Sequence, residues 1–173
     1  MPIKQTTPMS AVRKAAQDGV DSLVQGIVRQ LAYAGEMAVN EARSMPSPPV
    51  SLYMDANGEY KRSIPPHQPN YIDWTANLRS SIGYAVIVDG QPVTVWDFTP
   101  VAGKDGTGQE GAENGRKFAL SLAPEFPSGI TLVVVAGMKY AKYVSAKGYD
   151  VLDSAAALAR KVVPGLIQEL FAA

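Results

Sequence analysis

Few residues of this 173-residue chain have the type and spacing that catalysis or metal binding needs. His67 is the single histidine and lies in the proline-rich run 64–69, which excludes a site with several histidine ligands and favours a loop residue without a chemical role. Cysteine is absent, so disulfides and thiolate zinc sites are excluded. The acidic residues are scattered, and no spacing brings two carboxylates together in an apolar pocket. We therefore expect no catalytic, cofactor-binding or metal-binding residues, with an Asp/Glu metal site as the alternative.

A glycine-rich stretch is the second candidate for ligand binding. Gly106-x-Gly108-x-x-Gly111 has the spacing of a dinucleotide-binding fingerprint. It lies well past the preceding apolar run, however, and no acidic residue follows about 20 positions later to meet a ribose hydroxyl. Gly103-Lys104 is followed by Asp105 instead of Ser or Thr, which disfavours a phosphate loop. We predict a mobile Gly-rich loop over residues 99–117, with small-ligand binding by this loop as an alternative function.

Lysines and tyrosines alternate in a third candidate region. Lys139, Lys142 and Lys147 lie beside Tyr140 and Tyr143. The pattern is typical of a solvated edge whose tyrosine rings pack inward, and phosphate contact by a DNA-binding accessory domain is the sharper alternative. Sixteen basic residues balance sixteen acidic ones, so the net charge gives no support for a nucleic-acid or anionic-membrane partner.

The element that precedes these tyrosines is the strongest strand signal in the chain. Residues 130–135 are all aliphatic or β-branched, and the run stops at Ala136-Gly137. This pattern predicts a central strand that is buried on both faces. Such a strand needs covering layers, and the flanking segments have the patterns to supply them.

Helical periodicity is clearest at the two ends of the chain. Apolar residues from Val12 to Ala42 recur every three or four positions, about 3.67 residues per turn, which predicts a nearly straight helix over 10–43 with Ser10 as its cap. Such a helix is roughly 50 Å long and exceeds a small domain, so part of it should meet another subunit. Its internal glycines, Gly19, Gly26 and Gly35, indicate either a bend or close packing, the latter on the side of Gly19 and Gly26.

A second periodic helix closes the chain. It is predicted to start at a cap provided by Asp150, and its apolar register runs on to the end of the sequence. Pro164 should kink this helix, and a turn at Pro164-Gly165 is the alternative.

The middle of the chain alternates turns with short elements. Residues 46–70 hold six prolines and form an ordered excursion with a small hairpin at Asn57-Gly58. Asp73 or Thr75 should cap a short helix with Trp74, Leu78 and Ile82 on its apolar side. Asp89-Gly90 predicts a hairpin between the runs 84–88 and 93–98, and a helix is expected over 116–122.

Two of these segments resemble one family. Residues 75–82, Thr-Ala-Asn-Leu-Arg-Ser-Ser-Ile, resemble the T-G-x-L-R-x-S-I block of the neck proteins of long-tailed bacteriophages, also called head–tail joining or tail-completion proteins. Residues 140–144, Tyr-Ala-Lys-Tyr-Val, resemble their later Y-A-x-Y-V-E-x-G block. Ala76 replaces the family's glycine, Ser145 replaces its acidic residue, and Gly148 comes one position late. The order and separation of the elements agree.

The resemblance implies a structural role. It implies an α+β fold with a long N-terminal helix and a C-terminal helix packed on a small, mostly antiparallel sheet. It also implies a homo-oligomeric ring in the virion neck between the portal or connector (head-closure) protein and the tail terminator or tube protein, with DNA as a further partner in the lumen. The residues that it assigns to interfaces are Leu78, Arg79, Tyr140, Lys142 and Tyr143.

The bulk properties fit this reading. The length and the 46% hydrophobic content suit one domain over 1–173, in which residues 1–9 form a flexible arm. The sequence has neither an apolar run long enough to span a bilayer nor the apolar core of a signal peptide. We expect no membrane partner, synthesis in the cytoplasm of the bacterial host, and a final location in the virion.

Overall fold

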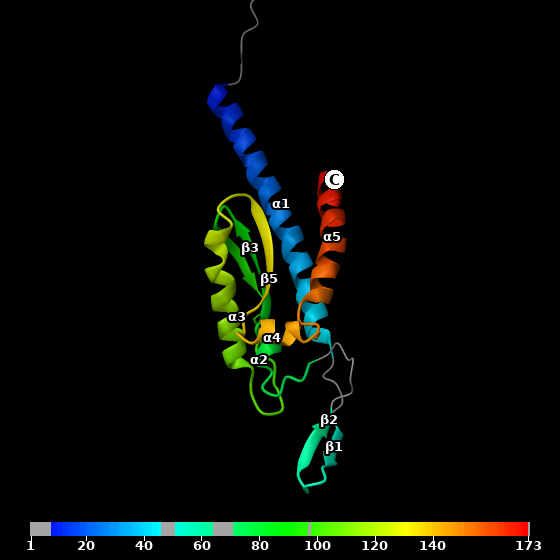
Figure 1. Ribbon diagram of the computed structural model, residues 1–173. Coiled ribbons are helices and arrows are strands. Elements are labelled where there is room, and N and C mark those ends of the chain that lie inside the picture. Colours follow the sequence, from blue (N-terminus) through cyan, green and yellow to red (C-terminus); the bar gives the residue numbers. More distant parts are fainter. Residues whose placement is uncertain (1–7, 46–50, 64–70, 97, 173) are drawn as a thin grey trace, which may run out of the picture.

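The computed structural model describes residues 8–45, 51–63, 71–96 and 98–172, and the fold is α+β as predicted. Figure 1 shows a three-stranded sheet between helices, with a separate two-stranded hairpin at one end. The strands of the sheet are β3 (Ile82–Val88), β4 (Gln91–Trp96) and β5 (Ile130–Ala136). The long helices are α1 (Met9–Ser44), α3 (Gln109–Ser121) and α5 (Asp153–Ala172).

The sheet has the order β4-β3-β5 and is antiparallel throughout. Strand β3 is therefore the central strand, and it is buried along all but its last residue. The prediction that 130–136 is a strand is confirmed, but the prediction that it is central is wrong, because β5 pairs only with β3 and most of its residues are half-buried. An apolar run indicates that a strand is covered by other elements, but it does not indicate which strands pair with it.

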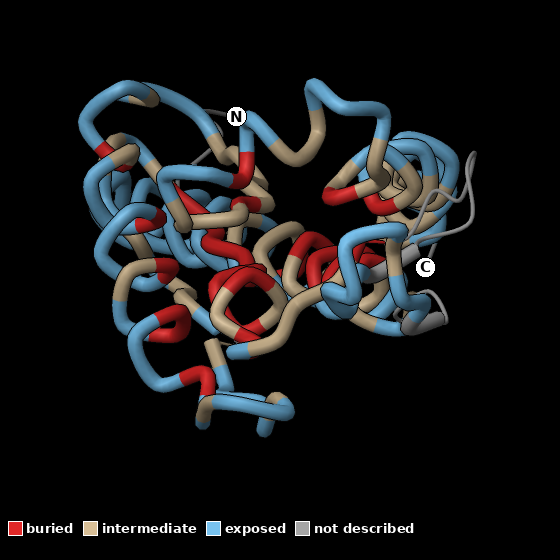
Figure 2. Tube along the Cα trace, turned by 60° about the horizontal axis from the view of Figure 1, so that its bottom comes forward, coloured by how far each residue is buried: buried red, intermediate tan, exposed pale blue. Residues whose placement is uncertain are grey.

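Helices cover the sheet on both faces. Buried residues of α1, including Ala38 and Val39, pack with Ile82, Tyr84 and Val86 of β3, and Ala155 of α5 joins them. On the other face Ala119 of α3 packs with Ala85 and Val135. Figure 2 shows the buried positions gathered inside and the exposed ones around the rim.

Helix α1 is a single element of 36 residues, about 54 Å at 1.5 Å per residue. It begins at Met9 with Pro8 as its N-cap and no side-chain cap bond, so the cap predicted at Ser10 is wrong, and Met9 does not belong to an arm. Close packing explains two of its glycines. A Cβ at Gly35 would lie 2.5 Å from the Tyr84 ring, and one at Gly26 would lie 2.9 Å from Leu170. Gly19 touches nothing, contrary to the pairing predicted with Gly26.

The predicted hairpins are present. Strands β1 (Ser51–Met54) and β2 (Tyr60–Ser63) flank the turn that contains Asn57-Gly58. Asp89 and Gly90 both have positive φ, 48° and 78°, as the tight turn between β3 and β4 requires. The Asp89 side chain also accepts a hydrogen bond from Gly129 N–H at 2.8 Å, which ties this turn to the start of β5.

The short and capped helices differ from prediction in their bounds. Helix α2 covers only Asn77–Ser80, so Trp74 precedes it, and Ile82 belongs to β3 and not to an apolar helix face. Helix α3 begins at Gln109, so the second half of the loop predicted over 99–117 is helical. A 3₁₀ turn (η1, Ala123–Glu125) follows α3.

The last two helices agree better with prediction. Helix α4 (Ala141–Ala146) carries the tyrosine block. Asp150 caps α5 as predicted, because its Oδ1 accepts the N–H groups of Asp153 and Ser154 at 3.0 and 3.2 Å. Helix α5 continues through Pro164, which excludes the alternative turn there.

Candidate functional site

The two sequence blocks that resemble the neck proteins meet in space. Leu78 of α2, with 1% of its surface exposed, belongs to a buried cluster with Tyr71, Ala141 and Val151. Val144 of α4 packs against the same cluster. The two blocks are about 60 residues apart in the chain, and their contact makes one packed unit at the end of the sheet where β5 leads into α4.

Two arginines join this unit to the end of α1. The Arg43 guanidinium of α1 donates to the carbonyl oxygens of Ile82 at 2.6 Å and Ser80 at 3.4 Å. Arg79 of α2 donates in the opposite direction, to the Met45 carbonyl just after α1. Both side chains are half-buried, so these charge-assisted bonds fix the angle at which α1 leaves the sheet.

Asp73 holds the start of α2. Its carboxylate accepts the Arg79 N–H at 2.8 Å, and Thr75 Oγ1 accepts the Asn77 N–H at 3.3 Å. Burial raises the pKa of the Asp73 carboxyl, although the hydrogen bond from the Arg79 N–H and the charge of Arg79 act in the opposite direction. Asp73 and Thr75, the two residues predicted as caps, therefore both cap α2, and each accepts a hydrogen bond from one backbone N–H group.

Tyrosines complete the polar side of this unit. Burial raises the pKa of Tyr71 to about 12, although the positive charge of Arg79 acts to lower it. The Arg79 guanidinium lies 5.7 Å from the centre of the Tyr71 ring. Burial also raises the pKa of Tyr140 to about 12, and the carboxylates of Asp73 and Glu110 add to the effect. A side-chain hydrogen bond joins Tyr140 to Thr75.

The raised pKa of Tyr71 predicts that the folded protein loses stability at alkaline pH. Between pH 10.0 and about 12 the unfolded chain releases the phenolic proton while the folded chain keeps it, so stability falls as pH rises. The slope from Tyr71 is at most about 1.4 kcal/mol per pH unit. Denaturant titrations from pH 9 to 11.5 should show a shallower fall for Tyr71→Phe. Tyr60→Phe, at an exposed tyrosine, should keep the wild-type slope, and equal slopes for all three proteins would contradict the assignment.

The five predicted interface residues divide into two groups. Leu78 is buried in its own subunit, and its assignment to an interface stays a prediction. Arg79 is half-buried and bonds within its own chain. Tyr140, Lys142 and Tyr143 are exposed, with 62% of Tyr143 accessible. The Lys147 ammonium lies 4.5 Å from the Tyr143 ring centre, and its hydrogen bond with the Tyr143 hydroxyl raises the pKa of the lysine.

The glycine-rich segment has a packing role that sequence reasoning missed. A Cβ at Gly111 would lie 2.0 Å from the Asn77 carbonyl oxygen, and one at Gly106 would lie 2.9 Å from the Thr75 carbonyl oxygen. Gly108 is buried against Ser80 and has φ +71°. The fingerprint spacing thus lets backbone approach backbone around α2. The signal available in the sequence was the pair Gly111 and Gly115, which lie four residues apart on one face of α3.

An open pocket of about 560 Å³ lies beside the edge strand β5. Phe118 of α3 and Leu122 just after it form one wall, and residues 133–138, Val151 and Leu152 form much of the rest. Lys139, Lys142 and Asp153 also line it. Most of the lining is apolar, which favours an apolar partner over a polar metabolite.

The first part of α1 is uncovered. Every residue from Met9 to Leu23 is exposed, and these include Met9, Val12, Val20 and Leu23, which are apolar. Figure 1 shows this part of α1 extending past the sheet and past the end of α5. No other described segment covers this apolar face, and uncovered apolar patches are typical of interaction surfaces.

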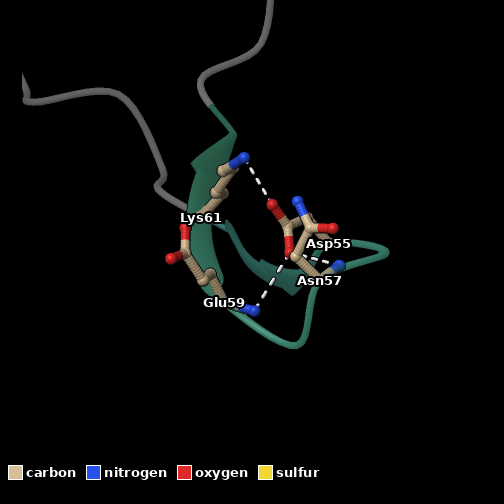
Figure 3. A network of polar contacts seen from close by, with 4 residues as sticks. All are labelled: Asp55, Asn57, Glu59 and Lys61. Atoms are coloured by element: carbon tan, nitrogen blue, oxygen red, sulfur yellow. Dashed lines mark hydrogen bonds and ion pairs between the residues drawn. The ribbon is translucent and has the colours of Figure 1, made fainter.

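The hairpin β1–β2 extends at the other end of the molecule. Figure 3 shows its turn organised by Asp55, whose Oδ1 accepts the N–H groups of Asn57 and Glu59 at 2.9 and 3.0 Å. Lys61 pairs with the other oxygen, and its hydrogen bond is the main cause that lowers the pKa of Asp55. Tyr53, Met54 and Tyr60 of this hairpin face solvent, and 73% of the Tyr60 surface is exposed. The turn is pre-organised, whereas a two-stranded ribbon alone is marginally stable.

The other candidate sites contribute little. Among the described residues, no three His, Cys, Asp or Glu side chains are grouped so that they could hold a metal ion. His67 lies outside the described residues, as do parts of the 46–70 excursion and the first seven residues of the predicted arm. In the part of the chain that the structure covers, no helix is both long and apolar enough to cross a membrane.

Comparison of the chain with models of known families, with curated proteins and with solved structures finds no match.

Proposed function

We propose that this protein is a structural component of a tailed-bacteriophage virion and forms part of the ring that joins the head connector to the tail. The observation that carries the proposal is the exposed apolar face of α1 from Met9 to Leu23. A helix segment of this length is marginal in water and gains its stability by burying such a face. The protein therefore acts by presenting surfaces to neighbours, and not by catalysis.

The positions of the uncovered elements support a joining role. The start of α1 and the hairpin β1–β2 lie at opposite ends of the subunit (Figure 1). A subunit that joins two structures needs one contact surface for each, besides those that it uses for its own copies. The proposed partners are further copies in a ring, the portal or head-closure protein on one side and the tail terminator or tube on the other, with DNA passing through the lumen.

Packing of the glycine-rich segment favours this function over small-ligand binding. Its glycines place backbone against backbone around α2, which accounts for the glycine spacing by packing and without a bound phosphate. The exposed Lys139 and Lys142 are compatible with DNA in the lumen of a ring.

The proposal is tested by the mass and shape of the full chain in solution. Light scattering during size exclusion at micromolar protein should give a multiple of 18.4 kDa that does not change on tenfold dilution, and negative-stain microscopy should show closed rings. The matching virion, stained with an antibody to this chain, should be labelled at the neck. A monomer at every concentration together with an unlabelled neck would exclude the proposal.

A further inference from the structure

The uncovered half of α1 continues a face that is buried further along the same helix. Ala16 and Val20 precede Ala34 and Ala38 by eighteen residues, about five turns, so the two pairs lie on the same side. Ala34 and Ala38 are 1% and 0% exposed, because the sheet and α5 cover them. Gly26 meets Leu170 near the end of α5, and from Leu23 back to Met9 no described residue buries the same face.

The same chain has an apolar hollow that nothing fills. This is the 560 Å³ pocket between α3, β5 and the start of α5. Phe118 is 43% exposed at its wall. The projecting half of α1 is about 22 Å long, and the lining run 133–138 extends at most about 20 Å, so the groove can hold most of that segment.

The charges beside the two surfaces also match. Arg13 lies at the edge of the apolar stripe of α1. The pocket has Asp153 at the start of α5. A helix in this groove can therefore place Arg13 near Asp153, which favours one direction as well as one position.

The occupant has to be a second copy of the chain. Helix α1 is unbroken, and its start and α4 lie at opposite ends of the subunit in Figure 1, so it cannot fold back into its own groove. We propose that the α1 segment Met9–Leu23 of one subunit docks in the β5 groove of the next. The two surfaces differ, so the contact is heterologous, and a repeated rotation closes it into a ring. The inference rests on the proposed function, and it adds which two surfaces meet.

Cysteine cross-linking tests this contact directly, because the natural chain contains no cysteine. Ala16→Cys lies in the stripe, and Ser145→Cys lies in the lining of the groove. A mixture of the two single variants should form covalent dimers on mild oxidation, and the double variant should form a ladder of higher multimers. Ala11→Cys, on the opposite side of the same helix, is the matched control and should cross-link at least tenfold less.

Disruption and rescue provide the second measurement. Ala16→Asp should convert the oligomer to monomer, whereas Ala11→Asp should keep the wild-type mass. Arg13→Glu should weaken assembly at least tenfold, and Asp153→Arg in the same chain should restore it. Circular dichroism of each monomeric variant should keep the wild-type helix content.

Each alternative result has a definite meaning. Covalent dimers of Ala16→Cys alone would show that the stripe pairs with another stripe, which overturns the groove. A ring that assembles normally with Ala16→Asp, or without Ala16–Ser145 cross-links, would also overturn it while the proposed function stands. A wild-type chain that is monomeric at every concentration would overturn this contact, and it would overturn the proposed function as well only if the virion neck were also unlabelled.

Discussion

Gly111→Ala should destabilise the protein by about 3 kcal/mol or more, because the added methyl group has no space. Its Cβ would lie 2.0 Å from the carbonyl oxygen of Asn77 and 2.7 Å from two further backbone atoms of that residue. Backbone on both sides of the contact cannot rotate away as a flexible side chain would. The melting temperature should fall by roughly 6–12 °C at this chain length, measured by calorimetry or thermal circular dichroism.

Gly19→Ala is the matched control for this substitution. It makes the same change inside a helix, and a Cβ at Gly19 has nothing within 4 Å. We expect it to stabilise the protein by up to about 1 kcal/mol, since alanine loses less backbone entropy than glycine on forming a helix. If Gly111→Ala were as stable as Gly19→Ala, the packing role given to the glycine-rich segment would be wrong.

Patterns that depend on local physics were readable from the sequence. The apolar period of α1 defined its length to within a residue at each end. Asp89-Gly90 defined the β3–β4 turn because both residues adopt a positive φ that few others tolerate. Asp150 was identified as the cap of α5 because its carboxylate needs only the N–H groups that follow it.

Features that depend on tertiary contact were not readable. Gly111 and Gly115 lower helix propensity, so the segment resembled a loop, and its helix forms because those glycines fit against α2 and β3. The order of the strands depends on which helices cover the sheet, so the run 130–136 could not show that β5 lies at an edge. The edge position leaves the pocket beside β5 open.

The candidate site was partly predictable for the same reason. The two resemblance blocks identified the segments that meet, but not that Leu78 is buried within the unit they form. No pattern in the sequence indicated that Arg43 would join α1 to the end of the sheet. Arg43 is one of several charged residues on a long helix, and its partners are carbonyl groups nearly 40 residues away.

Arg43→Met should cost about 2–4 kcal/mol of folding free energy. The substitution keeps an apolar stem and removes the donors to the Ile82 and Ser80 carbonyls, and hydrogen bonds from charged groups contribute about 1.5–3 kcal/mol. Arg43→Lys should recover only part of the loss, since a single ammonium lacks the fork of the guanidinium. Urea denaturation gives both values. Arg29→Met, at an exposed position of the same helix, should change stability by less than about 0.5 kcal/mol.

The pair Arg43 and Arg79 should also be coupled. Each donates across the same junction in opposite directions, so losing one loosens the geometry that the other needs. The double variant with Arg79→Met should therefore be less destabilised than the sum of the single variants, by about 1 kcal/mol. Strict additivity would mean that the two arginines act independently. The junction sets the direction in which α1 projects from the sheet, so a coupled loss should also reduce oligomer mass in light scattering under conditions where each single variant still assembles.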